Sequence, residues 1–407
     1  MRLVYKFYIP HTSELDEMMQ IANNLYNQAL YEFQKRWKED GHSMWFNEMD
    51  KYMKTVLNAE GKCNYKLLKS CTAQAVLYEL NKNVSQYVRR IQKHKEDPKV
   101  GIGSMPRYKK KGGMMPVCFT YVSTSLYDGY LHLRRDIKVK VPQWDKYYED
   151  IKNFKRIRLF PEYSRIKVEI FYDKDVPEAS EDKSNVAAID IGIDNLVTLV
   201  TKQGCYIYSG RFLKAYNKQY NNKLLQLLSI KDKCRQKKGY TKQMMKLLCD
   251  RNNYIDDVFN KYSRMIVDKL IEEQVTMLIV GYNEGWKTGK LKMAKQSKKD
   301  FRGIPHSRLL DKLEYKCKMA GIWFKKQEEG YTSKCDALAL EPIGKHDKYL
   351  GKRVQRGLFQ SSVGKRINAD QNGALNILRK AVGDSGFSQI IGRGHSLCPV
   401  RYINPFE

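Results

Sequence analysis

The chain has 407 residues and a formal net charge of +29, from 74 Lys and Arg against 45 Asp and Glu. The length allows two or three domains with ample core. The charge favours a polyanionic partner such as a nucleic acid, because each neutralised phosphate releases counterions. No run of about 18 apolar residues occurs, which excludes a membrane-spanning helix. The charged, alternating N-terminus also lacks the apolar stretch of a signal peptide.

Cysteine usage indicates a reducing compartment. The nine cysteines include no CxxC pair. An odd number without paired spacing is typical of free thiols, and it argues against a standard four-ligand zinc site. We therefore expect a cytoplasmic, nucleoid-associated protein, and the compact chain without nuclear signals favours a prokaryotic source.

The N-terminal half combines helices with short strands. Residues 1–9 alternate like a strand that Pro10 ends. Thr12 or Ser13 can cap the first of two helical patterns, which extend to about residue 96. The segments YLHLR, KVKVP, IRLFP and RIKVEIFYD then alternate like strands of a small antiparallel barrel. The strand at 1–9 has no partner nearby, so we expect it to join this barrel, with the helical unit as an insertion.

An α/β order begins near Ser184. NVAAIDIGIDNLVTLVT predicts a buried strand, a tight turn and a second strand. A long helical region follows, over about 211–274, with a bend at KDKCRQKKGYTKQ. TMLIVG and IWFKKQ are further strands, separated by the helix SRLLDKLEYKCKMAG. The loop-rich stretch 335–365 precedes the helix NADQNGALNILRKAV, so alternating strands and helices predict a layered α/β domain.

Two aspartates carry the first indication of chemistry. Asp190 ends a buried strand, which fixes its carboxylate, and a glycine turn follows. Asp370 lies just before or within the first turn of an amphipathic helix, where an N-cap or helix-dipole role is the alternative. We interpret Asp194 as a turn residue, while Asn372 and Asn376 either orient the acid or pack. Two-metal phosphodiester hydrolysis needs three or four carboxylates around two Mg²⁺ ions about 4 Å apart.

Several segments together resemble the TnpB-type RNA-guided nucleases, the OrfB family of transposon proteins that is ancestral to type V CRISPR effectors. They cover nearly all of 186–382 and are AAIDIGIDNLVTL, RNNYIDDVFNKYSRMIVD, LIVGYNEGWK, FRGIPHSRLLDKLEYKCKMAGI, YTSKCDALALEPIGKH, GKRVQRGLF and RINADQNGALNILRKA. The N-terminal half resembles the family in organisation only, with PRYKKKGG where the chain returns to the barrel.

The resemblance implies a multidomain α+β and α/β architecture. A wedge-type β-barrel with an inserted helical recognition lobe would precede a RuvC-like nuclease domain of the RNase H fold. We expect these boundaries: barrel 1–11 and 101–183, recognition lobe 12–100, RuvC-like domain 184–334 and 366–407, and a degenerate zinc-finger-like insert at 335–365.

The resemblance also implies an Asp, Glu, Asp set of metal ligands. Asp190 matches the first and Asp370 the third. Common members carry the glutamate after the third strand, where this chain has Gly281. A derived branch, shared with the eukaryotic Fanzor relatives, places it just before YTSK, and Glu329 matches that position. Because IWFKKQ can lie beside TMLIV in the sheet, Glu329 can reach the same metal pair from the neighbouring strand.

Other glutamates and a loss of activity are the alternatives. Glu284 competes for the ligand position, and Glu328 should point to the opposite side if the strand persists. If none of them is a ligand, the protein is a nuclease-dead, RNA-guided DNA-binding repressor. A guide-free nuclease of the Holliday-junction or RNase H type is disfavoured, because it would not need the large basic N-terminal half.

Family members usually hold a zinc ion between paired CxxC motifs in the insert. Here Cys335 stands alone, followed by His346, and these two residues do not make a structural zinc site. We expect the insert to be held by packing and nucleic-acid contacts without zinc, and Mg²⁺, as two ions, to be the cofactor.

The expected partners are a guide RNA, either a transposon-end RNA or a CRISPR RNA with a partner RNA, and target double-stranded DNA beside a short motif, with no membrane. Backbone contacts would set affinity while base pairing supplies sequence specificity. The candidate nucleic-acid-binding residues are Arg107, Tyr108, Lys109, Lys110, Lys111, Arg134, Arg135, Trp286, Lys287, Lys352, Arg353 and Arg356.

Overall fold

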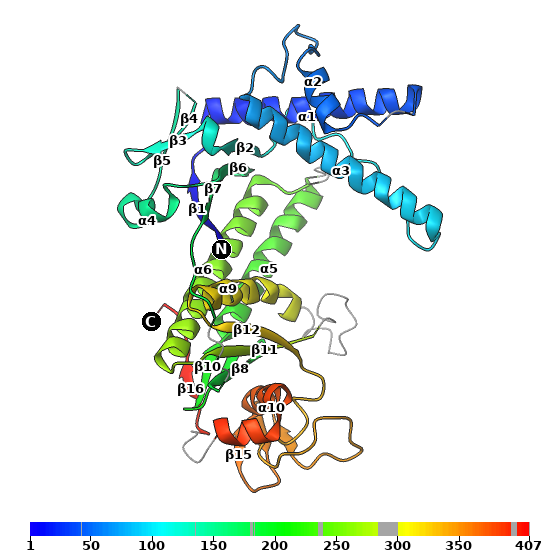
Figure 1. Ribbon diagram of the computed structural model, residues 1–407. Coiled ribbons are helices and arrows are strands. Elements are labelled where there is room, and N and C mark those ends of the chain that lie inside the picture. Colours follow the sequence, from blue (N-terminus) through cyan, green and yellow to red (C-terminus); the bar gives the residue numbers. More distant parts are fainter. Residues whose placement is uncertain are drawn as a thin grey trace. The chain divides into compact units, whose positions relative to one another are not determined.

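The computed structural model describes all residues except 42, 135, 180, 181, 183, 235–238, 284–299, 392–396 and 407 (Figure 1). The chain divides into two compact units, Met1–Asp175 and Val176–Glu407. Within the described ranges, no helix is both long enough and apolar enough to cross a membrane.

The strands of the first unit form two antiparallel sheets. The first has the order β1-β7-β6-β2, with bounds Arg2–Ile9, Arg165–Asp173, Arg156–Glu162 and Val117–Thr120. The second has the order β3-β4-β5, with bounds Ser125–Tyr127, Tyr130–Arg134 and Ile137–Lys140. The strand expected at 1–9 is β1, and it pairs with β7 along its whole length. Closure of these two sheets into one barrel stays a prediction.

The helices of this unit are amphipathic. They are α1 (Ser13–Glu39), α2 (Phe46–Met53), α3 (Ser70–Glu96), the 3₁₀ turn η1 (Tyr121–Ser123) and α4 (Trp144–Ile151). Thr12 caps α1, because its hydroxyl accepts a hydrogen bond from the Leu15 amide at 3.4 Å. The buried positions of α1 recur at three and four residues, and α1 and α3 share one core with the first sheet. The first three helices lie between β1 and β2 in the chain.

A six-stranded mixed sheet is the centre of the second unit. Its order is β12-β11-β8-β9-β10-β16, with bounds Trp323–Glu328, Met277–Tyr282, Val186–Ile191, Asn195–Val200, Cys205–Ser209 and Val400–Tyr402. β8, β9 and β10 are antiparallel, whereas β11 and β12 run parallel to β8. The prediction that IWFKKQ lies beside TMLIV is confirmed, because these residues form β12 and β11. Neither β10 nor β16 was expected.

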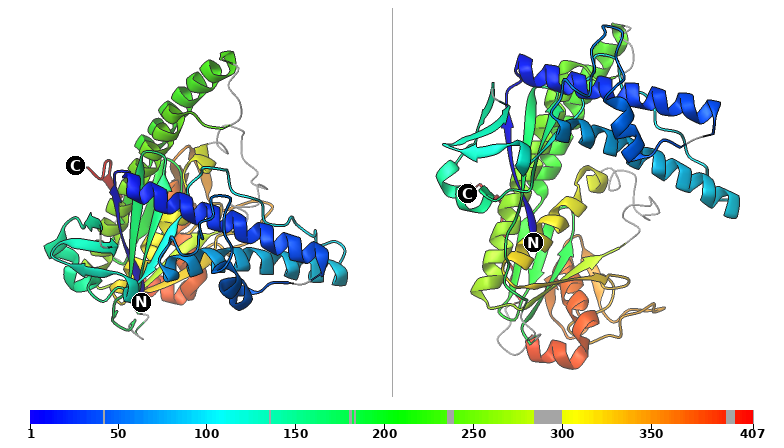
Figure 2. Two further views of the ribbon diagram at one scale, coloured as in Figure 1. Left: turned by 90° about the horizontal axis from the view of Figure 1, so that it is seen from above. Right: turned by 45° about the horizontal axis from the view of Figure 1, so that its top comes forward.

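Helices cover both faces of this sheet (Figures 1 and 2). They are α5 (Arg211–Lys233), α6 (Lys242–Glu272), α9 (His306–Met319) and α10 (Ala369–Ile390). Ala187 and Ile189 of β8 pack in the core that α6 and α9 share. Val186 and Ala188 pack in the core that α10 shares. Because side chains alternate along a strand, Asp190 is on the α10 face, at the edge where the parallel strands end.

The insert contains a small sheet of β13 (Lys352–Gln355), β14 (Leu358–Gln360) and β15 (Arg366–Asn368), so the stretch is less loop-rich than expected. A fully buried carboxylate, Asp336, organises it. Backbone amides of Leu338 and Ser362 donate to this carboxylate at 3.2 and 2.7 Å, and the hydroxyls of Ser361 and Ser362 donate at 2.8 and 3.0 Å. A buried carboxylate with this many donors can fix a turn-rich segment much as a structural ion does.

The two residues considered as zinc ligands make other contacts. The Cys335 thiol donates to the Gly344 carbonyl oxygen at 3.6 Å. A ring nitrogen of His346 lies 2.7 Å from the Pro342 carbonyl oxygen. Both side chains therefore bind backbone of the insert.

Candidate functional site

Asp190 is the innermost carboxylate of the candidate site. It is the second-last residue of β8, and its carboxyl lies against Gly373 of α10: a Cβ added there would be 2.7 Å from Asp190 Oδ2. Burial raises the pKa of Asp190 well above its usual range, and the nearby carboxylates of Asp370 and Glu329 raise it further. Asp190 of β8 thus interacts electrostatically with Asp370 of α10 and with Glu329, which follows β12.

Gly281, at the expected glutamate position, is adjacent to the carboxylate of Glu329. A Cβ added to Gly281 would lie 3.2 Å from Glu329 Oε2 and 2.5 Å from the Ile377 methyl group. The strand β12 ends at Glu328, so Glu329 begins the following loop. Its side chain therefore extends over the end of β11, into space that the missing side chain of Gly281 leaves open.

Asp370 is the second residue of α10, and its backbone is fixed by the N-cap. The Asn368 side-chain oxygen accepts the Asp370 amide at 2.9 Å, so Asn368 and not Asp370 caps the helix. Asn195 Nδ2 donates to one oxygen of Asp370 at 2.7 Å. Arg353 Nη2 lies 3.3 Å from the other oxygen. Asp370 therefore has an amide and a guanidinium as its immediate partners.

The oxygen donors fit a hard divalent cation, and the arrangement is not a closed coordination shell. Carboxylate oxygens are the ligands that Mg²⁺ prefers, and Asp190 lies in a negatively charged, desolvated environment that a cation would compensate. Within the described ranges, no three His, Cys, Asp or Glu side chains are already grouped as metal ligands. Arg353 Nη2 donates to Asp370 Oδ1 at 3.3 Å, so this carboxylate already has a cationic partner.

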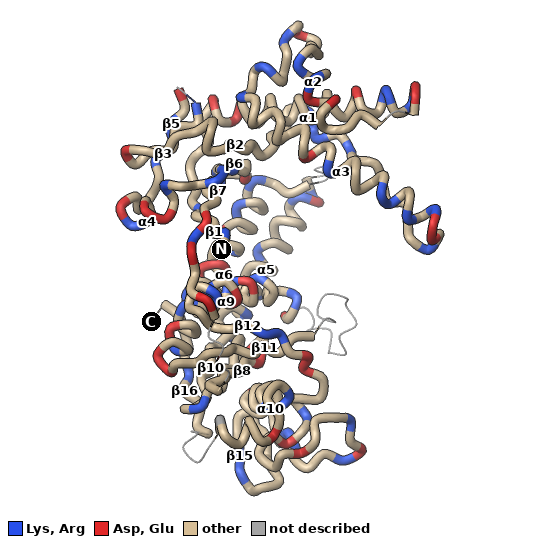
Figure 3. Tube along the Cα trace, viewed as in Figure 1, with Lys and Arg blue, Asp and Glu red and all other residues tan. Residues whose placement is uncertain are grey.

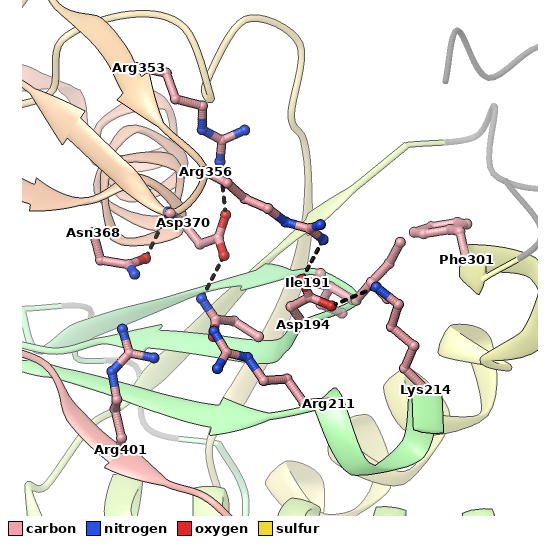
Figure 4. Close-up of a pocket in the computed structure, with 14 residues that line it drawn as sticks. Ile191, Asp194, Arg211, Lys214, Phe301, Arg353, Arg356, Asn368, Asp370 and Arg401 are labelled. Atoms are coloured by element: carbon pink, nitrogen blue, oxygen red, sulfur yellow. Dashed lines mark hydrogen bonds and ion pairs between the residues drawn. The ribbon is translucent and has the colours of Figure 1, made fainter. Parts of the chain in front are cut away.

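A cavity of about 740 Å³ opens beside Asp370 (Figure 4). Figure 4 shows Arg353 reaching Asp370 and Arg356 reaching Asp194 from the insert. Lys214 Nζ lies 3.2 Å from Oδ1 of the same Asp194 carboxylate. Asp194 is in the β8–β9 turn, as interpreted, and its side chain also joins the insert to α5.

Three further basic residues of this cavity were not predicted as site residues from the sequence. Arg211 and Lys214 begin α5, and Arg401 lies on β16. Together with Arg353 and Arg356 they make the cavity strongly cationic, as a phosphate-binding site requires. A basic residue directly after a strand, as in the sequence SGRFLK, was the available signal for Arg211; nothing in the sequence predicted β16.

The rival glutamates have different outcomes. Glu284 lies outside the described residues. Glu328 does not turn to the opposite face, because β12 ends at this residue and the alternation stops. It forms an ion pair with Lys380 of α10 and accepts the Gly330 amide at 2.6 Å. These contacts lower the pKa of Glu328, mainly through the Lys380 hydrogen bond.

The basic segment 107–111 is fixed to α1 by asparagines. The side chain of Asn27 accepts a hydrogen bond from the Lys109 amide at 2.7 Å and donates one to the Lys109 carbonyl oxygen at 3.0 Å. Asn23 donates to the Lys110 carbonyl at 3.0 Å. The hydroxyl of Tyr108 donates to Gln34 at 2.8 Å, and its ring stays half-exposed. Lys111 is exposed.

This segment forms one wall of a second cavity, of about 780 Å³, within the first unit. Its cations come from Arg107 and Lys109 and from the end of α3, where Lys and Arg positions recur (Figure 3). The α3 residues in the wall include Tyr87 and the cations Arg89, Arg90 and Lys93. Two of the residues predicted to bind nucleic acid, Arg107 and Lys109, line this cavity, and the sequence analysis did not single out the α3 residues.

The remaining candidates are scattered. Arg134 forms an exposed, bidentate ion pair with Asp136 at 2.7 and 2.6 Å. Lys352 is exposed on β13. Arg135, Trp286 and Lys287 lie outside the described residues.

Comparisons with known proteins agree with this architecture. Residues 169–287 match the OrfB_IS605 family, described as "Probable transposase", and residues 306–377 match the Cas12f1-like TNB domain. A TnpB-like protein, ORF457 of Acidianus two-tailed virus, is 25% identical over 218 residues, 52% of this chain and 45% of that protein. The protein in a structure titled the Cas12f1–sgRNA–target DNA complex is similar in fold, with a TM-score of 0.59, 16% identity, and coverage of 91% of this chain and 83% of that one.

The fold and the carboxylate cluster define a multidomain α+β protein in which acidic residues lie together at one edge of a mixed sheet. Both family matches and the viral relative show that the chain is similar to the TnpB-type family of transposon-associated proteins. The aligned region spans less than half of that viral relative's own length.

Proposed function

We propose that this protein is an RNA-guided DNA endonuclease that cuts guide-matched DNA in a RuvC-like site formed by Asp190, Glu329 and Asp370. It would bind a structured guide RNA, either a transposon-end RNA or a CRISPR RNA with a partner RNA. It would also recognise a short motif beside its target in duplex DNA. In such complexes base pairing supplies sequence specificity, and the protein reads shape and backbone.

One observation carries the proposal. The carboxylate of Glu329 lies over Gly281 and interacts electrostatically with Asp190, whose pKa its charge helps to raise. A surface glutamate without a role would turn toward solvent, because placing like charges together costs free energy. Close carboxylates in a desolvated site are typical of a catalytic centre.

The sheet supports the same class of enzyme. The sheet has three antiparallel strands followed by two parallel ones, in the order β10-β9-β8-β11-β12, and this mixed sheet is compatible with the RuvC-like domain that the family resemblance implies. The similar solved fold comes from a complex whose title names a guide RNA and target DNA. By that likeness, we assign the same two classes of nucleic acid to this chain.

The carboxylates would hold two Mg²⁺ ions, which activate water and stabilise the leaving oxygen in this class of hydrolysis. Asp190 would supply a ligand from β8, and Asn195 keeps Asp370 oriented toward the edge of the sheet. If cations bound at Asp370, Arg353 would have to release this carboxylate, and a phosphate of the nucleic acid would become its new partner.

The first unit would bind the nucleic acids. We assign the barrel to 1–11 and 101–183, the recognition lobe to 12–100, the RuvC-like domain to 184–334 and 366–407, and the insert to 335–365. The cavity between α3 and residues 104–109 would take the phosphate backbone, because its walls are cationic. The insert would act without zinc.

A nuclease-dead, RNA-guided DNA-binding repressor is the second candidate. The ion pair between Arg353 and Asp370 favours it, because a permanent guanidinium at this carboxylate would occupy a ligand position. The two candidates differ in cleavage and not in guide-dependent binding.

The test uses the full chain purified with RNA from its own locus. It is incubated with Mg²⁺ and plasmids that carry the guide-matched target beside randomised flanking bases. Glu329→Gln is compared with wild type, and Glu328→Gln is the matched control, because Glu328 is the neighbouring glutamate and pairs with Lys380. We expect wild type and Glu328→Gln to cut a subset of plasmids and Glu329→Gln to lose cleavage by at least about a hundredfold. Guide-dependent binding without cleavage by any of the three would identify the repressor.

A further inference from the structure

The segment that carries Glu329 has little support from the sheet. β12 is the outermost strand on its side of the described sheet, and it ends one residue before Glu329. The following residues form tight turns, in which the Cys335 amide donates to the Tyr331 carbonyl at 3.2 Å. Tyr331 adopts a left-handed backbone conformation with φ of 67°, which is costly for a residue other than glycine. Such a loop needs external contacts to hold one conformation.

Two asparagines on α10 supply these contacts. Asn372 and Asn376 are one helical turn apart, and both are fully buried. Asn376 Nδ2 donates to the carbonyl oxygens of Thr332 and Cys335, at 2.9 and 2.7 Å. Asn372 Nδ2 donates to the Cys335 carbonyl at 2.8 Å, and its side-chain oxygen accepts the Ala337 amide at 3.0 Å. Both amides thus converge on one carbonyl of the loop.

The same helix positions the other two carboxylates. Asp370 is in its first turn, and Gly373 lies against the carboxyl of Asp190. Asn372 and Asn376, on either side of Gly373 in the helix, bind the loop. The helix therefore connects all three carboxylates, and the asparagines are the part of this connection that serves Glu329.

We propose that Asn372 and Asn376 are positioning residues of the metal site, which hold the 329–337 loop so that the Glu329 carboxylate stays above Gly281. This inference rests on the proposed role of Glu329 as a ligand. A glutamate within a strand would be fixed by the sheet, whereas a glutamate in a loop needs this second anchor. Groups that orient metal ligands commonly change metal affinity by about 10- to 100-fold when removed.

A purely structural role makes a different prediction. If the asparagines only satisfy buried carbonyls, their loss lowers stability and affects metal binding equally whether or not Glu329 is present. If they act through Glu329, their loss has no further effect on metal binding once that carboxylate is gone. A double-mutant cycle separates the two cases.

The experiment measures Mn²⁺ affinity of the RNA-free full chain by electron paramagnetic resonance, because Mn²⁺ takes the oxygen ligands of Mg²⁺. The variants are Asn376→Leu, Glu329→Gln and the two combined. Asn372→Ser is a milder second variant in case Asn376→Leu folds poorly. Asn217→Leu is the matched control: this buried asparagine also donates to a loop carbonyl, Gly303, at 3.2 Å, in the same unit.

We expect Glu329→Gln to weaken Mn²⁺ binding at least about tenfold and Asn376→Leu to weaken it by about 3- to 10-fold. In the Glu329→Gln background, Asn376→Leu should change affinity by less than about twofold. Asn217→Leu should lower stability and leave Mn²⁺ affinity unchanged. An equal loss from Asn376→Leu in both backgrounds would overturn the positioning role while leaving Glu329 as a ligand. Unchanged affinity in Glu329→Gln would remove Glu329 from the proposed ligand set, and the positioning role with it.

Discussion

At the scale of single residues, two glycines make room for the acidic cluster. A Cβ at Gly281 would crowd Ile377 and the Glu329 carboxylate, and a Cβ at Gly373 would lie 2.7 Å from the carboxyl of Asp190. Neither glycine has a positive φ, so space and not backbone conformation requires it. The absence of a side chain at 281 is therefore compatible with an active site, because another carboxylate uses the space.

The Gly373 contact gives a testable prediction. Gly373→Ala places a methyl group closer to Asp190 Oδ2 than real Cβ atoms come, so the carboxyl has to move. We expect Mn²⁺ affinity to fall by about 3- to 10-fold. Gly344→Ala is the control, since a Cβ at Gly344 meets nothing within 4 Å. An unchanged affinity in Gly373→Ala would show that Asp190 tolerates displacement or is no ligand.

The charge of Asp190 gives a second prediction. Burial and the neighbouring carboxylates raise its pKa, so the folded chain binds this proton more tightly than the unfolded chain does. Without metal, stability therefore falls as pH rises above about 4, the pKa of an unfolded aspartate, until the raised folded-state pKa is passed. In a chelator at neutral pH, Asp190→Asn should stabilise the chain by roughly 1–3 kcal/mol.

This gain should disappear below about pH 4, where both states of the wild type are protonated. Thermal unfolding with and without Mg²⁺ measures it. The variant should also lose the stabilisation that Mg²⁺ gives to wild type. If the variant is less stable than wild type in chelator, the ionised Asp190 carboxylate does not destabilise the metal-free fold, and the prediction is wrong.

At the scale of elements, patterns that extend over several residues were predictable from sequence, and short pairings were not. The apolar runs in VAAIDI and TMLIVG predicted the central strands, and the neighbour of β11 was predicted correctly. β10 follows β9 after a tight turn in the sequence TKQG and was missed, although it is buried throughout its first four residues. β16 has only three residues, and its pairing with β10 depends on tertiary contact.

The candidate site shows the same division. Strand ends identified Asp190, and the family resemblance was needed for Glu329, because a loop glutamate carries no periodic signal. Glu328 was expected on the opposite side only if the strand continued past it, and β12 ends at this residue. Arg401 lines the cavity beside Asp370, and residues of α3 line the cavity of the first unit. Both segments are distant in sequence from the other walls, so only the folded structure reveals these contacts.

The insert provides a prediction about an element. Asp336 accepts hydrogen bonds from both ends of the insert, so removing its carboxylate leaves several buried donors unpaired. We expect Asp336→Ala to destabilise the chain by roughly 3 kcal/mol or more. Amide hydrogen exchange should show the change first within 336–365.

A zinc chelator should leave exchange in the wild-type insert unchanged, because Cys335 and His346 bind backbone carbonyls. The exposed Lys345→Gln is the control for substitution within the insert. Rapid exchange of the wild-type insert after chelation would instead indicate a structural metal.

At the scale of the whole molecule, only part of the net charge of +29 is expected to contact nucleic acid. Many cations are already paired: Arg2 with Asp173, Arg134 with Asp136 and Lys318 with Glu314. Surface pairs of this kind contribute little to stability. The two cavities differ from these isolated surface pairs, because in each cavity several cations line one concave surface. Such a surface raises the local concentration of a polyanion.

The cavity of the first unit gives the last prediction. Arg89→Gln with Arg107→Gln removes one cation from each wall. If each contacts a phosphate, the slope of log affinity against log salt for guide RNA should become shallower by about 1 to 2, since each contact contributes about 0.7 to 0.9. Lys35→Gln with Lys38→Gln removes the same charge from exposed positions of α1 that do not line the cavity. A salt titration of RNA binding measures all three proteins, and equal slopes for the two double variants would mean that net charge, and not this cavity, holds the RNA.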